Sequence, residues 1–295
     1  MPQYLNPTVV AKAEALGLKA RVLVEGLRVG DHKSPYRGFS VEFVQHREYV
    51  PGDDIRHIDW KSYGRSERYT IKQYEQETNF IAHVLVDASK SMRYGQGETN
   101  KLEVAKTLAA CLSYVIAKQR DTVSLSVFDS TYRVQLPPSS QLGHINAILA
   151  ELENTRPEEK TDIATILRLL ADKVRRRGLV FLISDCFDQP SRILTGLQQL
   201  RFLGHDVTVF HVMHGDELTF PFDGNVRFDG LEEVEEIRTR PRLIRQAYLN
   251  EVQAFLTELR KGCETYRCDY VCVDTTKPLA VILSEYLARR LQGGR

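Results

Sequence analysis

Residues 80–92 read Phe-Ile-Ala-His-Val-Leu-Val-Asp-Ala-Ser-Lys-Ser-Met, and this stretch decides the fold class. Its first part, 80–86, is apolar except at His83, which is typical of a strand buried on both faces of a parallel sheet. Asp87, Ser89 and Ser91 follow directly, where open α/β folds build ligand sites. One carboxylate and two hydroxyls are oxygen ligands of the kind that hard cations prefer. The alternative is structural, because Asp and Ser are also common in turns and helix caps.

Two later segments add oxygen ligands to the same predicted edge. Thr161 begins a helical pattern over 162–174, and residues 179–185 form a second buried-strand run that ends in Asp185. Each has a structural alternative, since Thr161 could cap the helix and Asp185 could start a turn before Pro190. Parallel strands share one carboxyl edge, so we expect both residues to meet the Asp87 loop. The combined set suits Mg²⁺, with Mn²⁺ or Ca²⁺ as alternatives.

Strand and helix patterns alternate along the rest of the chain, which favours parallel βαβ units. The predicted helices are 102–116, 144–152, 162–174, 191–202, 242–259 and 279–291, and the predicted strands are 122–128, 132–136, 179–183, 206–212 and 269–273. Turn signals within 218–238 interrupt this order and indicate an inserted β-hairpin or ribbon. We therefore predict an α/β fold, with an open, mostly parallel sheet and helices on both faces, over 79–295. Residues 1–78 are predicted to form a helix, at 9–27, and a small β-rich subdomain.

A second signature precedes the sheet, in residues 47–61. Pro51-Gly52 is a strong turn signal, and charged side chains surround it. The single tryptophan, Trp60, is expected to anchor the segment against the sheet domain. The segment could bind a partner or join the two subdomains, and the candidate residues for either role are Arg47, Tyr49, Asp53, Asp54, Arg56, Asp59 and Trp60.

The five oxygen-bearing residues, in their order along the chain, resemble the metal-ion-dependent adhesion site of von Willebrand factor type A domains. The resemblance implies a divalent metal held by Asp87, Ser89, Ser91, Thr161 and Asp185. It also implies one coordination position left for an acidic side chain of a partner protein. The last loop departs from the family pattern, because Ser184-Asp185-Cys186 stands where Thr-Asp-Gly is common. Asp188 lies close enough in the sequence to share the role of Asp185.

The 47–61 block and the sheet domain together resemble the domain-of-unknown-function-58 family of bacteria and archaea. That family combines Arg-x-Tyr-x-Pro-Gly-Asp-Asp-x-Arg-x-Ile-Asp-Trp with a von Willebrand A-like domain, and residues 47–60 match this block. Its members are commonly encoded beside MoxR-type AAA+ ATPases. The resemblance therefore implies a partner class, a MoxR-type ATPase or its client, rather than a reaction.

Composition and hydropathy narrow the functional classes. The formal net charge of +1 gives no general attraction to nucleic acid or anionic lipid. No stretch approaches the roughly 18 apolar residues of a membrane-spanning helix. Met1-Pro2-Gln3 does not begin a signal peptide, so we expect a cytoplasmic location without an integral membrane span.

The motifs favour a binding protein over an enzyme. The sequence contains no G-x-S-x-G elbow, P-loop lysine motif or G-x-G-x-x-G loop. Our leading hypothesis is a non-enzymatic, metal-dependent protein-binding module, an adaptor for a MoxR-type ATPase in protein assembly or maturation. One alternative is a metal-independent adaptor that binds through residues 47–61. A second is a metal-dependent phosphohydrolase acting at Asp87, Ser89 and Ser91.

Overall fold

The computed structural model describes residues 41–50, 58–66, 68–76, 81–118, 121–141, 143–224, 226–228 and 237–293. The chain divides into two compact units. The smaller one covers Asp31–Asn79, and the larger one includes Phe80–Arg295. The predicted helix at 9–27 lies outside the described residues.

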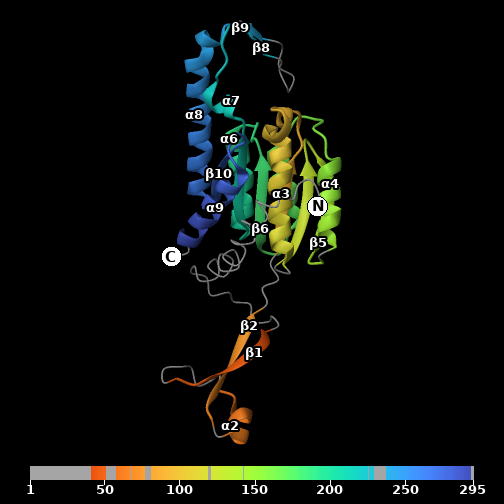
Figure 1. Cartoon of the computed structure of the whole chain (residues 1–295), viewed down its shortest axis with the longest axis vertical. Coiled ribbons are helices and arrows are strands. Elements are labelled where there is room, and N and C mark those ends of the chain that lie inside the picture. The colour runs from red at the N-terminus through yellow and green to blue at the C-terminus, as the bar shows by residue number, and fades with distance from the viewer. Residues whose placement is uncertain are drawn as a thin grey trace. The chain divides into compact units, whose positions relative to one another are not determined.

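A six-stranded sheet forms the centre of the described part of the larger unit (Figure 1). Its strands are β3 (Ile81–Asp87), β4 (Thr122–Phe128), β5 (Tyr132–Ser139), β6 (Gly178–Ser184), β7 (Asp206–Met213) and β10 (Asp269–Asp274). Their order across the sheet is β10-β7-β6-β3-β4-β5. Strand β5 pairs antiparallel with β4, and every other pairing is parallel. The predicted open, mostly parallel α/β sheet is confirmed.

Side-chain alternation along β3 explains why the sheet is covered on both faces. Val84 and Val86 belong to one apolar core, whereas Leu85 between them belongs to the other. All three side chains are fully buried. A strand that must bury both faces needs a near-continuous apolar run, which is the pattern that predicted it.

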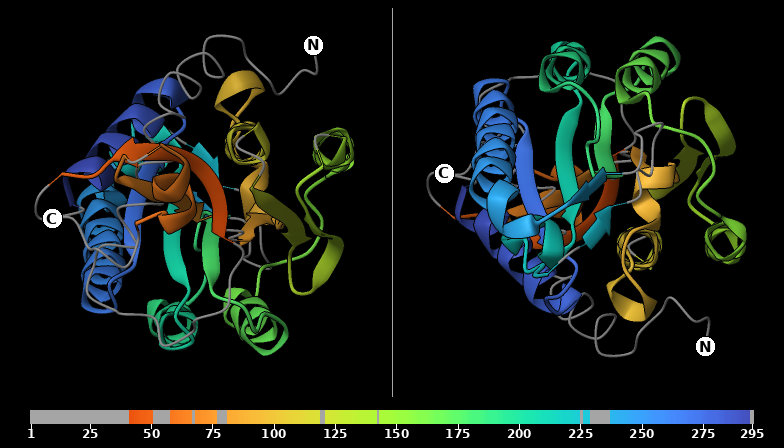
Figure 2. Two further views of the ribbon diagram at one scale, coloured as in Figure 1. Left: turned by 90° about the horizontal axis from the view of Figure 1, so that it is seen from below. Right: turned by 90° about the horizontal axis from the view of Figure 1, so that it is seen from above.

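Helices cover the two faces of the sheet as separate layers (Figure 2). The helices that contribute to the first core are α3 (Lys101–Lys118), α4 (His144–Asn154) and α9 (Leu279–Gly293). Those that contribute to the second are α5 (Ile163–Lys173), α6 (Pro190–Phe202) and α8 (Pro241–Thr265). None of the helices in the described ranges is long and apolar enough to cross a membrane.

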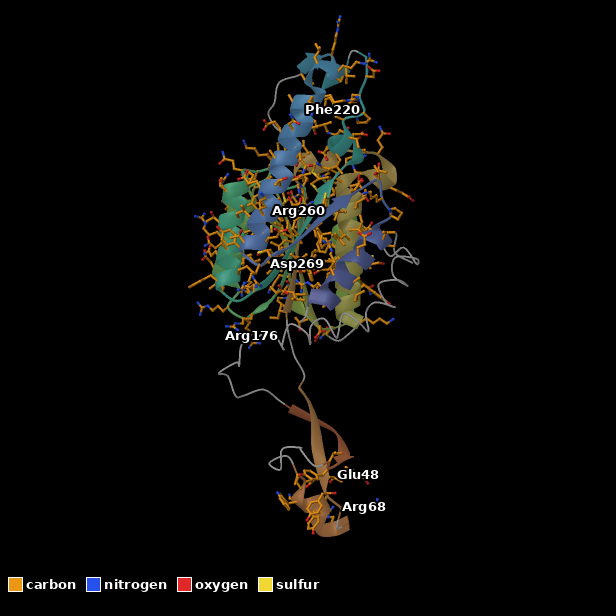
Figure 3. The ribbon with its side chains drawn as sticks, turned by 90° about the vertical axis from the view of Figure 1, so that its left-hand side faces the viewer. Glu48, Arg68, Arg176, Phe220, Arg260 and Asp269 are labelled. Carbon is orange, nitrogen blue, oxygen red and sulfur yellow. The ribbon has the colours of Figure 1, made fainter. Side chains whose placement is uncertain are left out.

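Helix α8 is longer than the sequence predicted, because it continues past 259 to Thr265. At Gly262 the helix packs closely against α6, since a Cβ atom there would lie 2.3 Å from Leu194 Cδ1. Arg260, labelled in Figure 3, lies over the Tyr270 ring of β10, and its guanidinium carbon is 5.7 Å from the ring centroid. The predicted end was wrong because tertiary packing outweighs the low helix propensity of glycine.

After β7, where turn signals predicted a break in the alternation of strands and helices, the chain forms a short helix and a ribbon. Helix α7 spans Gly215–Thr219, and the following Phe220 adopts a left-handed backbone conformation. Strands β8 (Val226–Phe228) and β9 (Ile237–Thr239) pair antiparallel. This pair confirms the predicted inserted ribbon.

The described part of the smaller unit is a two-stranded antiparallel pair with one helix. Strand β1 (Val41–Glu48) pairs with β2 (Thr70–Gln76), and α2 (Trp60–Ser66) lies between them in the chain. The backbone N–H of Asp59 donates to the Thr70 carbonyl at 2.8 Å, which ties the start of α2 to β2.

Candidate functional site

The candidate site lies where the strand order reverses. Strands β3 and β6 are neighbours in the sheet, and the chain leaves them toward opposite sides: β4 follows β3 on one side and β7 follows β6 on the other. Open α/β sheets bind ligands in the crevice beyond the carboxyl ends of such strands. Asp87 ends β3, and Ser184 ends β6 and is followed by Asp185.

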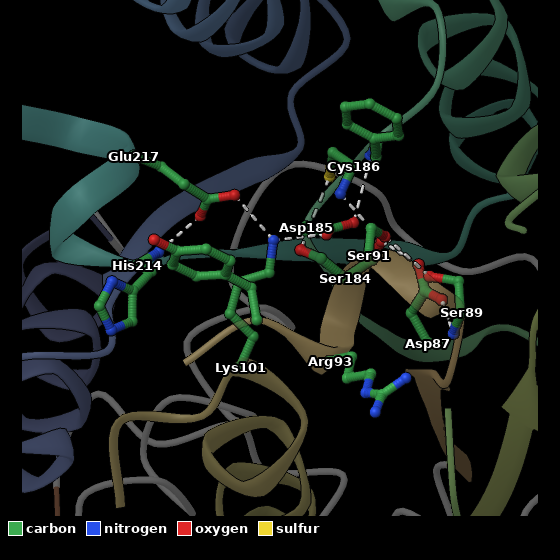
Figure 4. Close-up of polar contacts among 12 residues, drawn as sticks. Asp87, Ser89, Ser91, Arg93, Lys101, Ser184, Asp185, Cys186, His214 and Glu217 are labelled. Atoms are coloured by element: carbon green, nitrogen blue, oxygen red, sulfur yellow. Dashed lines mark hydrogen bonds and ion pairs between the residues drawn. The ribbon is translucent and has the colours of Figure 1, made fainter. Parts of the chain in front are cut away.

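The carboxylate of Asp87 is fully buried and surrounded by donors (Figure 4). The backbone N–H of Ser89 donates to Oδ1 at 2.9 Å. The hydroxyls of Thr161 and Ser184 both donate to Oδ2, and the Thr161 distance is 3.2 Å. The structure therefore brings Thr161 to the Asp87 loop, as the shared strand edge predicted.

The two serines of the motif lie beside each other in the loop that follows Asp87. Ser89 and Ser91 are both buried, and their hydroxyl oxygens are 3.0 Å apart. Backbone hydrogen bonds join this loop to the segment before Thr161: Lys90 N donates to Glu159 O at 2.8 Å, and Glu158 N donates to Ala88 O at 3.2 Å. These two contacts place the Thr161 hydroxyl at the site.

Helix α5 is capped by Asp162 rather than by Thr161. The Asp162 carboxylate accepts from Thr165 N at 3.2 Å and from the Thr165 hydroxyl at 2.9 Å. The capping alternative for Thr161 is therefore wrong. Because the next residue satisfies the helix N-terminus, the Thr161 hydroxyl is left to contact Asp87.

Burial raises the pKa of Asp87 to about 7, and the nearby Asp185 carboxylate adds to the shift. Hydrogen bonds from Ser184 and Ser89 act in the opposite direction but do not offset it. A raised pKa means that the folded protein disfavours the charged form of this carboxylate. A bound cation would stabilise that charged form.

Asp185 is held differently, by an internal cation. Its Oδ2 lies 2.7 Å from Lys101 Nζ, and the same ammonium donates to Glu217 Oε1 at 3.0 Å (Figure 4). The Asp185 contact is a close ion pair between two buried side chains. The Asp185 carbonyl is hydrogen-bonded to His211 Nε2 at 2.9 Å, so the backbone of the loop is fixed as well.

The loop after Asp185 keeps a glycine-like backbone without glycine. Cys186 has φ of 54°, in the left-handed region that non-glycine residues seldom adopt. Its N–H donates to the Ser184 hydroxyl at 2.9 Å, and its side chain is fully buried. The missing glycine of the family pattern is thus accommodated by a strained cysteine. Asp188, the alternative to Asp185, pairs with Arg192 at 3.1 Å.

Four residues of this cluster were not predicted from the sequence: Lys101, Glu217, Ser184 and His211. The first two lie 116 residues apart in the sequence, Lys101 at the start of α3 and Glu217 in α7. The only signal was the position of Lys101 itself, since a cation in the first turn of a helix is disfavoured by the helix dipole.

The donor set fits a hard cation in part. Asp87 supplies a carboxylate, and Ser89, Ser91 and Thr161 supply hydroxyls, all of them oxygen ligands. Within the described ranges no group of three His, Cys, Asp or Glu side chains could hold a metal ion, so any cation here would depend on the hydroxyls. Asp185, the fifth predicted ligand, already has a cationic partner in Lys101.

The 47–61 block is described only in part. Asp53, Asp54 and Arg56 lie outside the described residues, and Arg47 lies in β1, opposite Ile71 of β2. The Asp59 carboxylate accepts from the N–H groups of residues 61 and 62, so it caps α2.

Aromatic residues of the same unit form a cluster of side chains from α2, from the residue after β1 and from the residue before β2. Tyr63 and Tyr69 stack with ring centroids 4.5 Å apart, and Trp60 meets the Tyr63 ring edge-on at 6.2 Å. Tyr49 lies 6.4 Å from Tyr69, and Trp60 is 63% exposed. The predicted anchoring of Trp60 on the sheet domain stays a prediction.

The strand order, the antiparallel edge strand and the covering of both faces define a von Willebrand A-like α/β domain. Residues 45–256 match the family described as "Protein of unknown function DUF58". The match covers most of the chain, and the protein belongs to this family.

The chain is similar to the following proteins at low sequence identity. An uncharacterized protein of Mycobacterium tuberculosis, Rv1480, is 24% identical over 246 residues, which cover 81% of this chain and 76% of that protein. The crystal structure of BatB from Bacteroides thetaiotaomicron is 22% identical with a TM-score of 0.48, covering 72% of this chain and 99% of that one. A von Willebrand factor type A protein from Catenulispora acidiphila is 11% identical with a TM-score of 0.44, covering 75% of this chain and 44% of that one.

Proposed function

We propose that this chain is a non-enzymatic protein-binding module whose binding depends on a divalent cation, Mg²⁺ or alternatively Mn²⁺ or Ca²⁺. The observation that carries the proposal is the buried Asp87 carboxylate among hydroxyl oxygens at the switch point of the sheet. Such a group is costly to bury as an anion unless a cation compensates it.

The protein's own residues would act as a rigid cradle. Asp87 would hold the cation through its carboxylate, while Ser89, Ser91 and Thr161 would add neutral oxygens. A cation bound this way would offer an open coordination position to a carboxylate of the partner. Because hydroxyl ligands are uncharged, the residues of the cradle would neutralise the cation only in part, which favours the incoming carboxylate.

The partner we propose is a MoxR-type AAA+ ATPase or a client of that ATPase, with the module acting as an adaptor in protein assembly or maturation. The resemblance to the family implies this partner class, because its members are commonly encoded beside such ATPases, and the chain's membership of the family supports the proposal. The module would work in the cytoplasm.

The test is affinity capture from lysate of the native host, with Mg²⁺ or with EDTA, followed by mass spectrometry. We expect a MoxR-type ATPase or its client to be captured by the wild type only with Mg²⁺. Asp87→Ala should reduce capture at least tenfold while circular dichroism shows a folded protein. Asp172→Ala is the matched control, because Asp172 is exposed on α5. Capture that persists in EDTA and with Asp87→Ala would contradict the proposal.

A second candidate function is metal-independent binding through residues 47–61. The exposed Trp60 and the tyrosines that cluster with it favour this alternative, since exposed aromatic side chains are common anchors at interfaces. Capture that is insensitive to EDTA but lost with Trp60→Ala would select it.

A further inference from the structure

Lys101 is the least expected charge at the candidate site. It is the first residue of α3, yet it is only 2% exposed. Burial lowers the pKa of Lys101, but the carboxylates of Asp185 and Glu217 more than offset this and raise it above its ordinary value. The ammonium thus lies inside the protein between two carboxylates, 2.7 Å from Asp185 Oδ2 and 3.0 Å from Glu217 Oε1, next to the last loop of the site.

Both oxygens of the Asp185 carboxylate are already engaged. Oδ1 accepts from Phe187 N at 3.3 Å, and Oδ2 pairs with Lys101 Nζ at 2.7 Å. The hydrogen bond between His211 Nε2 and the Asp185 carbonyl fixes the backbone at the same residue. Turning this carboxylate toward Asp87 would leave the Lys101 ammonium with Glu217 as its one remaining carboxylate contact among the described residues.

We propose that Asp185 is the counter-ion of Lys101 and not a metal ligand, and that Lys101 is a positioning residue. Asp87 is then the only anionic ligand of the site. This inference rests on the proposed metal-dependent function and specifies its ligand set. It also explains how the site tolerates two nearby buried carboxylates, since the charge of one of them is neutralised within the protein.

Glu217 extends the same cluster into the chain beyond β7. Its Oε1 accepts from Lys101, and its Oε2 accepts from His214 N at 2.7 Å. Lys101 therefore joins the last loop of the site to α7, which precedes the β8–β9 ribbon. The ammonium positions two elements at once.

The test compares Mn²⁺ binding by variants that lack one or both charges of the Lys101–Asp185 pair. Mn²⁺ alone is the probe, and its dissociation constant is measured by electron paramagnetic resonance. Asp185→Asn leaves the Lys101 charge less compensated, so we expect Mn²⁺ to bind about tenfold more weakly. The double variant Lys101→Met with Asp185→Asn removes both charges of the pair. It should bind Mn²⁺ within about threefold of the wild type.

Two reference variants complete this comparison. Asp87→Asn should bind at least about a hundredfold more weakly than the wild type, because it removes the anionic ligand. Lys106 and Glu103 form a second pair on α3, with 2.9 Å between Nζ and Oε1, and Lys106 is also buried. Lys106→Met with Glu103→Gln is the matched control and should leave Mn²⁺ binding unchanged. A Lys101/Asp185 double variant that binds as weakly as Asp87→Asn would overturn the inference, because the Asp185 carboxylate itself would then be required.

Thermal unfolding in EDTA tests the ion pair without any metal. Asp185→Asn alone should unfold at a lower temperature than the double variant, since it leaves a buried ammonium short of a partner. Equal unfolding temperatures would overturn the pairing. If the wild type binds no Mn²⁺, the proposed metal-dependent function fails, while this comparison still decides whether Asp185 serves Lys101.

Discussion

Cys186 illustrates how a single residue carries strain at the candidate site. Its left-handed backbone places the carbonyl of Cys186 to accept from Asp188 N at 2.7 Å, which closes the turn after Asp185. An L-residue in this conformation costs about 1–2 kcal/mol relative to glycine. The thiol recovers part of that cost by being fully buried in the apolar core around α5 and α6.

Replacing Cys186 with glycine should therefore cost little. The backbone strain is relieved while the buried thiol is lost, and we expect the free energy of unfolding to change by less than about 1 kcal/mol. Cys111 is the control, because it is equally buried but lies within α3. There the same substitution loses burial and also weakens the helix, so it should cost about 1–2 kcal/mol more, measured by urea denaturation. Equal costs at the two positions would show that Cys186 is not strained.

At the scale of elements, the register between β3 and β6 sets the geometry of the site. Gly178 begins β6 and pairs with Ile81 at the start of β3. Six residues along, the two strands deliver Asp87 and Ser184 to the same edge. The polar cluster exists because two strands far apart in the chain run side by side in a fixed register.

Gly178→Ala should disturb this pairing directly. A Cβ atom at Gly178 would lie 2.2 Å from the Ile81 carbonyl oxygen, so the backbone of one strand would have to move. We expect a destabilisation of about 1–3 kcal/mol in urea denaturation. Gly143→Ala is the control, because a Cβ atom there meets nothing within 4 Å, and it should change stability by less than about 0.5 kcal/mol. A Gly178→Ala protein as stable as the control would contradict the close approach of the two strands.

At the scale of the whole molecule, ionisable groups buried in the sheet couple global stability to pH. Burial, and then the neighbouring His205, lower the pKa of His83 to about 4. Burial likewise lowers the pKa of His211 to about 4. The unfolded chain binds these protons near the ordinary value of about 6.5, so stability is lost as the pH falls from there toward 4. Asp87 acts in the opposite direction, because its pKa is raised and its protonation in the folded state stabilises the protein as the pH falls through about 7.

The contribution of His83 can be isolated with His83→Asn, whose amide can replace the hydrogen bond between Nδ1 and the Ser124 hydroxyl, 2.8 Å long. Between pH 6.5 and 4 the wild type should lose about 3 kcal/mol more stability than this variant. Urea denaturation at a series of pH values in EDTA measures the difference, and the Asp87 contribution cancels because both proteins contain it. Parallel curves for the two proteins would show that His83 is not held neutral in the fold.

Much of the fold could be predicted because its causes are local in sequence. The apolar run of β3 and the helical spacing of α3 identify their elements without reference to the rest of the chain. The convergence of Asp87 and Thr161 was predictable as well, since parallel strands share a carboxyl edge. The capping of α5 by Asp162 rather than Thr161 was not, because both residues are competent caps and only the loop geometry distinguishes them.

By itself, the sequence determined the α/β class, the motif at the end of the first central strand and the resemblance to the family to which the chain belongs. The tertiary structure alone decided how the charges pair. Lys101 meets Asp185 and Glu217 across long separations in the chain, and no periodicity or spacing encodes that meeting. The physical reason is that periodicity reports which face of an element is buried, whereas an ion pair depends on which elements become neighbours once the sheet has closed.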